Sequence, residues 1–240
     1  MEKCRELSIN IIGYSDTDYP KRLKTIVDPP PILYSRGNLD CIADKYLSVA
    51  LVGTRNPSEW GSRCAYKIGK ELALSDVVVV SGLALGCDVQ AHLGCLEVDG
   101  KTIAVLAGGL DEINPISNLE VAEQILLKDG CLISETPLGT KPKRYNFVQR
   151  NRIQSGLSQG VIIVETDIKG GTIATANFAK EQHRALGCIK FPAKETYQEV
   201  ARGNVRLISE GATPLVNKSD IEKFVKTLPD TSSIKIDLFN

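Results

Sequence analysis

The residues best suited to bind phosphate lie in a short segment after residue 140. Cations and aromatic rings are interleaved there, and Asn151 lies between two of the arginines: Lys141, Lys143, Arg144, Tyr145, Phe147, Arg150, Asn151 and Arg152. Lysine and arginine bind backbone phosphates and aromatic rings stack on bases, so this mixture is typical of single-stranded nucleic-acid binding. A run of charges is more often a solvated face, and the sequence alone leaves that interpretation open.

Glycine-containing turns that follow apolar runs supply a second set of candidates. These are Gly53, Arg55, Ser81, Gly82, Gly86, Lys169, Gly170, Gly171 and Thr172. Glycine lets the backbone approach a ligand closely, and a helix that starts there offers free N–H groups to an anion. Neither a GxxxxGK[ST] loop nor a GxGxxG fingerprint occurs, so ATP and NAD have little support and we expect no cofactor.

Two pairs of polar residues could be mistaken for catalytic or metal groups. Asp88 could cap the helix that follows it, and His92 lies four residues later on the same helical face, so the two could hydrogen-bond. An acid/base pair and a bond that orders the loop both fit this spacing, and no nucleophile accompanies them. Asp111 and Glu112 point in different directions and indicate an ordered turn, so we expect neither a catalytic residue nor a metal site.

The composition places limits on the class of protein. Lys+Arg and Asp+Glu balance at 29 each, so any nucleic-acid site must be a local concentration of positive charge. No apolar run approaches the roughly 18 residues of a membrane span, and the first residues lack the apolar core of a signal peptide. We therefore expect a cytoplasmic protein without membrane contact. The 7 cysteines, with no CxxC, indicate reduced and buried thiols.

Strand-like and helix-like segments alternate along the chain. Continuous apolar runs predict strands at 47–52, 77–80, 102–106, 131–133, 160–165 and 187–190. Amphipathic stretches predict helices at 61–74, 88–98, 119–128, 148–157, 173–185 and 219–227. This order predicts an α/β fold with a doubly wound, mostly parallel, Rossmann-like sheet and helices on both faces. Ligands bind such sheets at the carboxyl ends of the strands.

The chain is predicted to have three parts. Residues 1–45 form an N-terminal extension that packs on the core, and their prolines suggest that it crosses the edge of the sheet without joining it. Residues 46–228 form the Rossmann-like domain, and residues 229–240 form a polar tail.

Several segments, in this order, resemble the DNA-processing protein A (DprA/Smf) family. They are PPPILYSRGN, ALVGTRNPSEWG, VVVVSGLALGCDVQAH, GKTIAVLAGGLDEINPISN, GCLISETPLG, FVQRNRIQSGLSQGVIIVE, GGTIATANFAKEQHR and RLISEGATPL. The resemblance implies a dimer that protects single-stranded DNA and passes it to the RecA recombinase during uptake of foreign DNA, in competence and transformation. We expect this binding to be non-catalytic. The resemblance places DNA contacts on Arg55, Phe147, Arg150, Arg152, Lys169 and Gly170, and a phosphate-holding loop on Ser81, Gly82 and Gly86.

The chain departs from the family pattern in places. Val148 stands where proline is usual, Lys169-Gly170-Gly171 replaces a Ser-Gly loop, and Pro192-Ala193 replaces Pro-Gly. Neither an N-terminal helical module nor a C-terminal winged helix is evident. The resemblance therefore supports strand binding more directly than the RecA partnership, and a role in a mobile element or in defence stays open.

Two other functions and one further partner remain as hypotheses. A LOG-type nucleotide hydrolase would need an acid near Asn177, in a stretch that resembles its PGGxGTxxE motif only partly. A nucleotide-binding sensor could use the same cleft. The tail sequence KIDLF, through Ile236, Leu238 and Phe239, resembles a sliding-clamp docking peptide, although any disordered tail can show such a pair.

The sequence thus leads to one hypothesis about mechanism. Successive phosphates of a strand are bound along one rim of the sheet by Arg55, Arg150, Arg152 and Lys169. Phe147 or Tyr145 stacks on a base.

Overall fold

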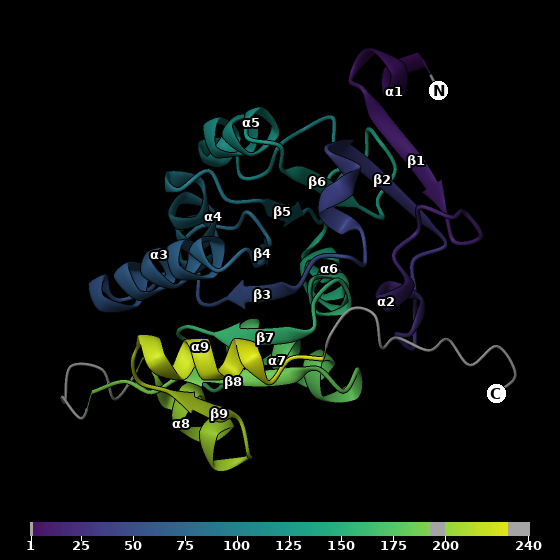
Figure 1. Cartoon of the computed structure of the whole chain (residues 1–240). Coiled ribbons are helices and arrows are strands. Elements are labelled where there is room, and N and C mark those ends of the chain that lie inside the picture. Colours follow the sequence, from purple (N-terminus) through teal and green to yellow (C-terminus); the bar gives the residue numbers. More distant parts are fainter. Residues whose placement is uncertain (1, 193–199, 230–240) are drawn as a thin grey trace, which may run out of the picture.

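The computed structural model describes residues 2–192 and 200–229, and they build one nine-stranded sheet. The strands are β1 Ile9–Gly13, β2 Ile32–Gly37, β3 Ser48–Val52, β4 Val78–Ser81, β5 Thr102–Val105, β6 Cys131–Ser134, β7 Gly160–Ile163, β8 Ala185–Ile189 and β9 Thr213–Leu215. Their order is β1-β2-β6-β5-β4-β3-β7-β8-β9 (Figure 1). All pairs from β6 to β9 are parallel. The predicted doubly wound, mostly parallel sheet is confirmed. The order in which strands are added along the sheet reverses between β3 and β7, which are parallel neighbours.

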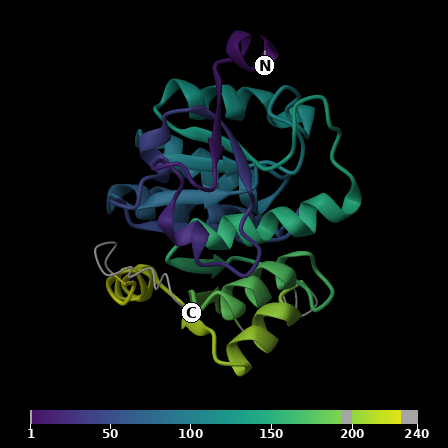
Figure 2. The same ribbon diagram turned by 90° about the vertical axis from the view of Figure 1, so that its right-hand side faces the viewer.

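Helices cover both faces of this sheet. The longer ones are α3 Glu59–Leu74, α4 Cys87–Glu97, α5 Leu119–Leu127, α6 Arg144–Gly156, α7 Thr172–Glu181, α8 Arg202–Ser209 and α9 Lys218–Lys226. Apolar side chains of α3, α4 and α9 pack in one core, and those of α6, α7 and α8 pack in the core on the opposite face. In the turned view, α6 runs between the N-terminal segment and α7 (Figure 2).

The N-terminal residues join the sheet, so the prediction that they only cross its edge is wrong. β2 pairs antiparallel with β6, and β1 pairs antiparallel with β2. The prolines at 29–31 end just before β2, and the alternate residues Leu33 and Ser35 are fully buried. The physical reason is that β6 would otherwise expose a row of unpaired N–H and C=O groups.

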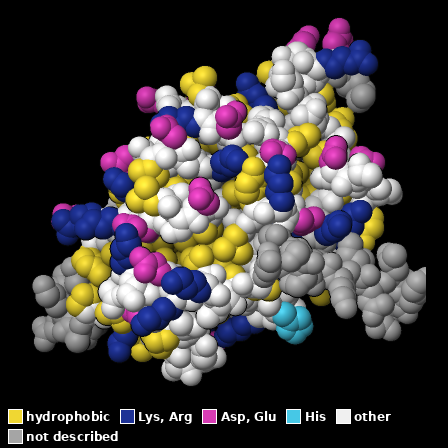
Figure 3. All heavy atoms as spheres, viewed as in Figure 1, with side chains coloured by type: hydrophobic (Ala, Val, Ile, Leu, Met, Phe, Trp, Pro, Cys, Tyr) yellow, Lys and Arg dark blue, Asp and Glu magenta, His cyan; other side chains and the backbone are white. Residues whose placement is uncertain are grey.

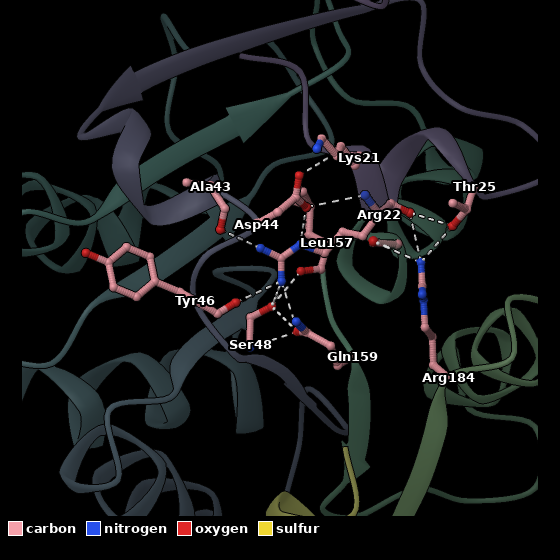
Figure 4. Close-up of polar contacts among 11 residues, drawn as sticks. Lys21, Arg22, Thr25, Ala43, Asp44, Tyr46, Ser48, Leu157, Gln159 and Arg184 are labelled. Carbon is pink, nitrogen blue, oxygen red and sulfur yellow. Dashed lines mark hydrogen bonds and ion pairs between the residues drawn. The ribbon is translucent and has the colours of Figure 1, made fainter. Parts of the chain in front are cut away.

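A buried arginine attaches the short helix α2 (Lys21–Lys24) to the centre of the sheet (Figure 4). Arg22 is only 1% exposed and forms an ion pair with Asp44. Its guanidinium also donates hydrogen bonds to four oxygens, those of Ala43 O, Tyr46 O, Ser48 Oγ and Gln159 Oε1. Burial lowers the pKa of Arg22 to about 10, so it remains a cation at neutral pH. The first 45 residues are therefore an integral part of the fold.

The thiols and the surface agree with the composition. All the cysteines are free, and every one except the half-buried Cys64 is buried. Burial raises the pKa of Cys41 and of Cys64 to about 11, so both are protonated at neutral pH. Lys/Arg and Asp/Glu side chains are interspersed over the face seen in Figure 3. In the described part of the chain, every helix is too short or too polar to span a bilayer.

Candidate nucleic-acid interface

A cavity of about 820 Å³ opens where the strand order reverses, beside the carboxyl ends of β3 and β7. Its walls come from the turn after β3, the loop after β4, the first turns of α6 and the turn before α7. Such a position is where open α/β sheets bind their ligands, because loops diverge there and leave a crevice. The predicted site and this cavity therefore coincide in the fold.

Most of the predicted residues line this cavity. They are Gly53, Arg55, Phe147, Arg150, Asn151, Lys169, Gly170, Gly171 and Thr172. The remaining predicted residues do not line it: Ser81, Gly82, Gly86 and Arg152. Tyr145, the alternative stacking residue, is 61% exposed on the first turn of α6 and also lies outside the lining.

Three exposed cations stand around the cavity: Arg55, Arg144 and Lys169. Within residues 2–192 and 200–229, none of them forms an ion pair. The guanidinium of Arg55 lies 4.7 Å from the centre of the Phe147 ring, a cation–π contact. The Arg55 guanidinium thus covers one face of the ring that we expect to stack a base.

Arg150 lies at the floor of the cavity and is only 5% exposed. Its Nη1 donates to the carbonyl oxygens of Gly82 and Val105, and its Nε donates to Asn151 Oδ1 at 3.2 Å. Burial lowers the pKa of Arg150 to about 10, which leaves it charged at neutral pH. Arg150 therefore joins the loop after β4 and the end of β5 to α6, and it brings a buried positive charge to the cavity.

Arg152 faces away from this group. Its Nη1 and Nη2 donate to the two carboxylate oxygens of Glu135 at 2.7 and 2.6 Å, and its Nε pairs with Asp28 at 3.1 Å. Residues two apart on a helix lie on different faces, so Arg150 and Arg152 cannot both point into one cavity. The hypothesis of a row of cations that includes Arg152 does not match this placement, and we leave Arg152 out of the proposed interface.

The loop after β4 serves the fold. Ser81 Oγ donates to Leu51 O at 2.7 Å and is fully buried. Gly82 donates its N–H to Asp88 Oδ2 at 3.1 Å, and Gly86 has a φ of +78° and packs against the backbone of Thr54 and Arg55. A side chain at Gly86 would be strained by this φ and would meet that backbone, which accounts for the glycine.

The possible hydrogen bond between Asp88 and His92 does not form: His92 Nδ1 pairs with Thr102 Oγ1 at 2.7 Å, and His92 Nε2 has no partner among the described atoms. Burial lowers the pKa of His92 to about 3, so the ring is neutral at neutral pH. Asp88 lies inside the first turn of α4, whose cap is Gly86, so the predicted cap is also wrong. Asp111 accepts a hydrogen bond from Gly139 N and pairs with Lys3, as expected of an ordered turn.

Sequence reasoning missed Gln154 at the floor of the cavity. It lines the cavity, is 1% exposed, and its Nε2 has no hydrogen-bond partner among the described atoms. A buried polar group without a partner is rare. The only signal in the sequence was an amide between Ile153 and Leu157, at a helix position next to the core.

Gly82→Ala tests the packing of α6 against the loop after β4. A methyl group at Gly82 would overlap with the Arg150 guanidinium and the Gln154 amide. We expect the free energy of unfolding to fall by about 1–3 kcal/mol, the usual cost of overpacking, as measured by urea denaturation. Gly171→Ala is the control, because nothing lies within 4 Å of a Cβ at that position. Equal stability of the two variants would contradict the packing described here.

Most of the chain matches one protein family. The model of the family described as "DNA recombination-mediator protein A" matches residues 10–226. The chain belongs to this family. Among curated members, Protein Smf of Synechocystis sp. is 39% identical over 231 residues, which is 95% of this chain and 57% of the relative. DNA processing protein DprA of Bacillus subtilis is 39% identical over 217 residues, 90% of this chain and 71% of the relative.

Two solved structures from the recombination-mediator family resemble the fold closely. The DprA structure from Streptococcus pneumoniae has a TM-score of 0.82 and 33% identity, over 92% of this chain and 76% of that one. The DprA structure from Helicobacter pylori has a TM-score of 0.81 and 28% identity, over 93% of this chain and 98% of that one. The molybdenum cofactor binding protein from Rippkaea orientalis, with a TM-score of 0.52 and 16% identity, shares the fold alone.

Proposed function

We propose that this chain binds single-stranded DNA across the cavity and does so without catalysis. The observation that carries the proposal is the set of exposed cations around the Phe147 ring, Arg55, Arg144 and Lys169, which form no ion pair with any described residue. The Helicobacter pylori relative, which is similar over 93% of this chain, is described by its single-stranded DNA binding mode. Cations for phosphates and a ring for a base together match what such a ligand requires.

The mechanism follows from where these side chains lie. Arg55 and Lys169 bind successive phosphates, helped by the backbone N–H groups of Gly171 and Thr172 at the start of α7. A base stacks on Phe147 after the Arg55 guanidinium has moved from the ring to a phosphate. Arg150, fixed at the floor, adds positive charge without leaving its hydrogen bonds.

The wider role is also part of the proposal. Binding protects the strand and presents it to a RecA-type recombinase in recombination-dependent DNA uptake, with the protein acting as a homodimer in the cytoplasm. The description of the matching family as a recombination mediator supports this role. Because the chain spans 57% of the Synechocystis relative, partners of that whole protein are carried over only as proposals.

The polar tail and its sliding-clamp peptide fall outside the described residues. Ile236, Leu238 and Phe239 therefore keep the status of a hypothesis. Deletion of Ile236–Asn240 is expected to abolish co-purification with the clamp, and unchanged co-purification would dispose of the idea.

A nucleotide ligand is the second candidate, because a cavity of about 820 Å³ is large enough to hold one nucleotide. The hydrolase version has less support. Asp88 is the acid that lines the cavity, and its carboxylate accepts a backbone hydrogen bond, while Asn177 is exposed on α7. Release of free base from nucleoside monophosphates, above a control without protein, would overturn the non-catalytic assignment.

Titration with labelled single- and double-stranded oligonucleotides at two salt concentrations tests the proposal. Binding that neutralises about three phosphates should give a slope of log K against log salt near −2, at about −0.7 per contact on a single strand. A single nucleotide would give a shallow slope. Equal affinity for the oligonucleotide and for a nucleoside monophosphate would favour the sensor and contradict strand binding.

A further inference from the structure

Two buried carboxylates lie near the starts of helices at this edge of the sheet, and each accepts hydrogen bonds from backbone N–H groups. At α3, the Glu165 carboxylate accepts hydrogen bonds from Ser58 N at 2.9 Å and from Ser58 Oγ at 2.7 Å, and Glu165 is fully buried. Ser58 is the residue that caps α3. The N-terminal end of a helix attracts anions through its free N–H groups, and here a side chain already fills that place.

The second internal carboxylate is Asp88 at the start of α4. It is 5% exposed, lines the floor of the cavity and accepts the Gly82 N–H at 3.1 Å. The N–H groups of Ala84 and Gly53 also stabilise its charged form, as does the positive charge of Arg150. Burial still raises the pKa of Asp88 above its usual range, because desolvation is the largest effect. Backbone N–H groups from the turn after β3 (Gly53) and from the loop after β4 (Gly82 and Ala84) thus point to one carboxylate.

The start of α7 is different. Its cap, Gly171, is exposed and provides no side-chain hydrogen bond, and a Cβ there would meet nothing within 4 Å. Lys169 and Thr172 line the cavity on either side of it. The start of α7 therefore lies beside the cavity, and within the described residues no carboxylate is hydrogen-bonded to its N–H groups.

We propose that Asp88 is a specificity-determining residue. Its carboxylate occupies the backbone N–H groups of Gly53, Gly82 and Ala84, which would otherwise be free to bind a phosphate inside the cavity. The inference rests on the proposed strand binding. Asp88 occupies these N–H groups, and its negative charge offsets the positive charge of Arg150. The remaining positive charge of the cavity lies at its rim, on Arg55, Arg144 and Lys169. A strand can place several phosphates on that rim. A nucleoside monophosphate has one phosphate group, and Asp88 already occupies the N–H donors inside the cavity, so the cavity selects the polymer.

The test is to remove the internal carboxylate and supply an anion from solution. Asp88→Ala should unfold at a lower temperature than the wild type, and formate or inorganic phosphate should restore part of the loss. Potassium chloride at matched ionic strength should not. Asp88→Asn is the matched control, because its amide fills the same volume and leaves no room for an added anion.

Nucleotide affinity gives the second measurement. Thymidine 5′-monophosphate should bind Asp88→Ala about tenfold more tightly than it binds the wild type, the effect expected of one charge-assisted hydrogen bond. Equal binding by the wild type and the variant would overturn the inference, as would equal rescue of the alanine and asparagine variants. If Asp88→Ala does not fold, failure of the nucleotide to displace an oligonucleotide from the wild type supports the inference, and efficient displacement contradicts it.

Strand binding is measured on the wild type in the same series. A wild type that binds no single-stranded oligonucleotide contradicts the proposed function, whatever the anion does to Asp88→Ala. If added anions stabilise Asp88→Ala but the wild type binds no strand, Asp88 still fills an anion position inside the protein. Its proposed role in selecting a strand is then contradicted. The two failures are therefore distinguishable.

Discussion

Arg22→Ala is expected to lower the free energy of unfolding by about 3–5 kcal/mol, the usual cost of removing one partner from a buried ion pair. The side chain is 1% exposed and holds together oxygens from the segment before β3, from β3 itself and from the start of β7. Without the guanidinium, the buried Gln159 amide oxygen and the part-buried Ala43 and Tyr46 carbonyls lose these hydrogen bonds, and an unsatisfied buried group costs about 1–3 kcal/mol. Urea denaturation followed by circular dichroism measures the change.

Two variants make the Arg22 measurement specific. Arg22→Lys keeps the charge but cannot donate to several oxygens at once, so its stability should lie between those of the wild type and Arg22→Ala. Arg206→Ala removes an exposed arginine that pairs with Glu210 one turn away and should change stability by less than about 0.5 kcal/mol. A loss below about 1 kcal/mol in Arg22→Ala would show that α2 and its neighbours are held by other contacts.

The buried arginine also shows where sequence analysis of the fold stops. The central strands were predictable because strands buried on both faces are continuous apolar runs, as in Val78–Ser81. β1 and β2 were missed because their place depends on the free edge of β6, some 100 residues away, and because prolines precede β2. β9 is three residues long and contains Pro214, so it carries no local strand signal.

The candidate site was partly predictable for a related reason. Arg55 and Lys169 stand beside glycines in turns that follow strands, and the topology of a parallel sheet brings such turns to one edge. The choice between Arg150 and Arg152 depends on the phase of α6, which begins at Arg144, four residues before the predicted start. The partner of Gly82 was hidden as well, because no local pattern indicates that the Asp88 carboxylate accepts its N–H.

Arg55→Ala is expected to weaken single-stranded DNA binding by about 10–100-fold, as a charge-assisted hydrogen bond to phosphate contributes about 1.5–3 kcal/mol. The loss should be the same for oligonucleotides of different sequence, and the salt slope should become shallower by about 0.7. Fluorescence anisotropy at two salt concentrations measures both. Arg63→Ala is the matched control, because Arg63 is exposed on α3, pairs with Glu59 and lies outside the cavity.

The contact between Arg55 and Phe147 makes this prediction sharper. Phe147→Ala alone should cost about 1–3 kcal/mol of binding if the ring stacks a base. Since the two side chains are 4.7 Å apart, their effects should not add in the double variant. If the Arg55 guanidinium leaves the ring only when DNA binds, Arg55→Ala also removes a competitor for the ring, and the double variant should lose more affinity than the sum of the single losses. An unchanged affinity in Arg55→Ala would mean that the strand does not cross this rim.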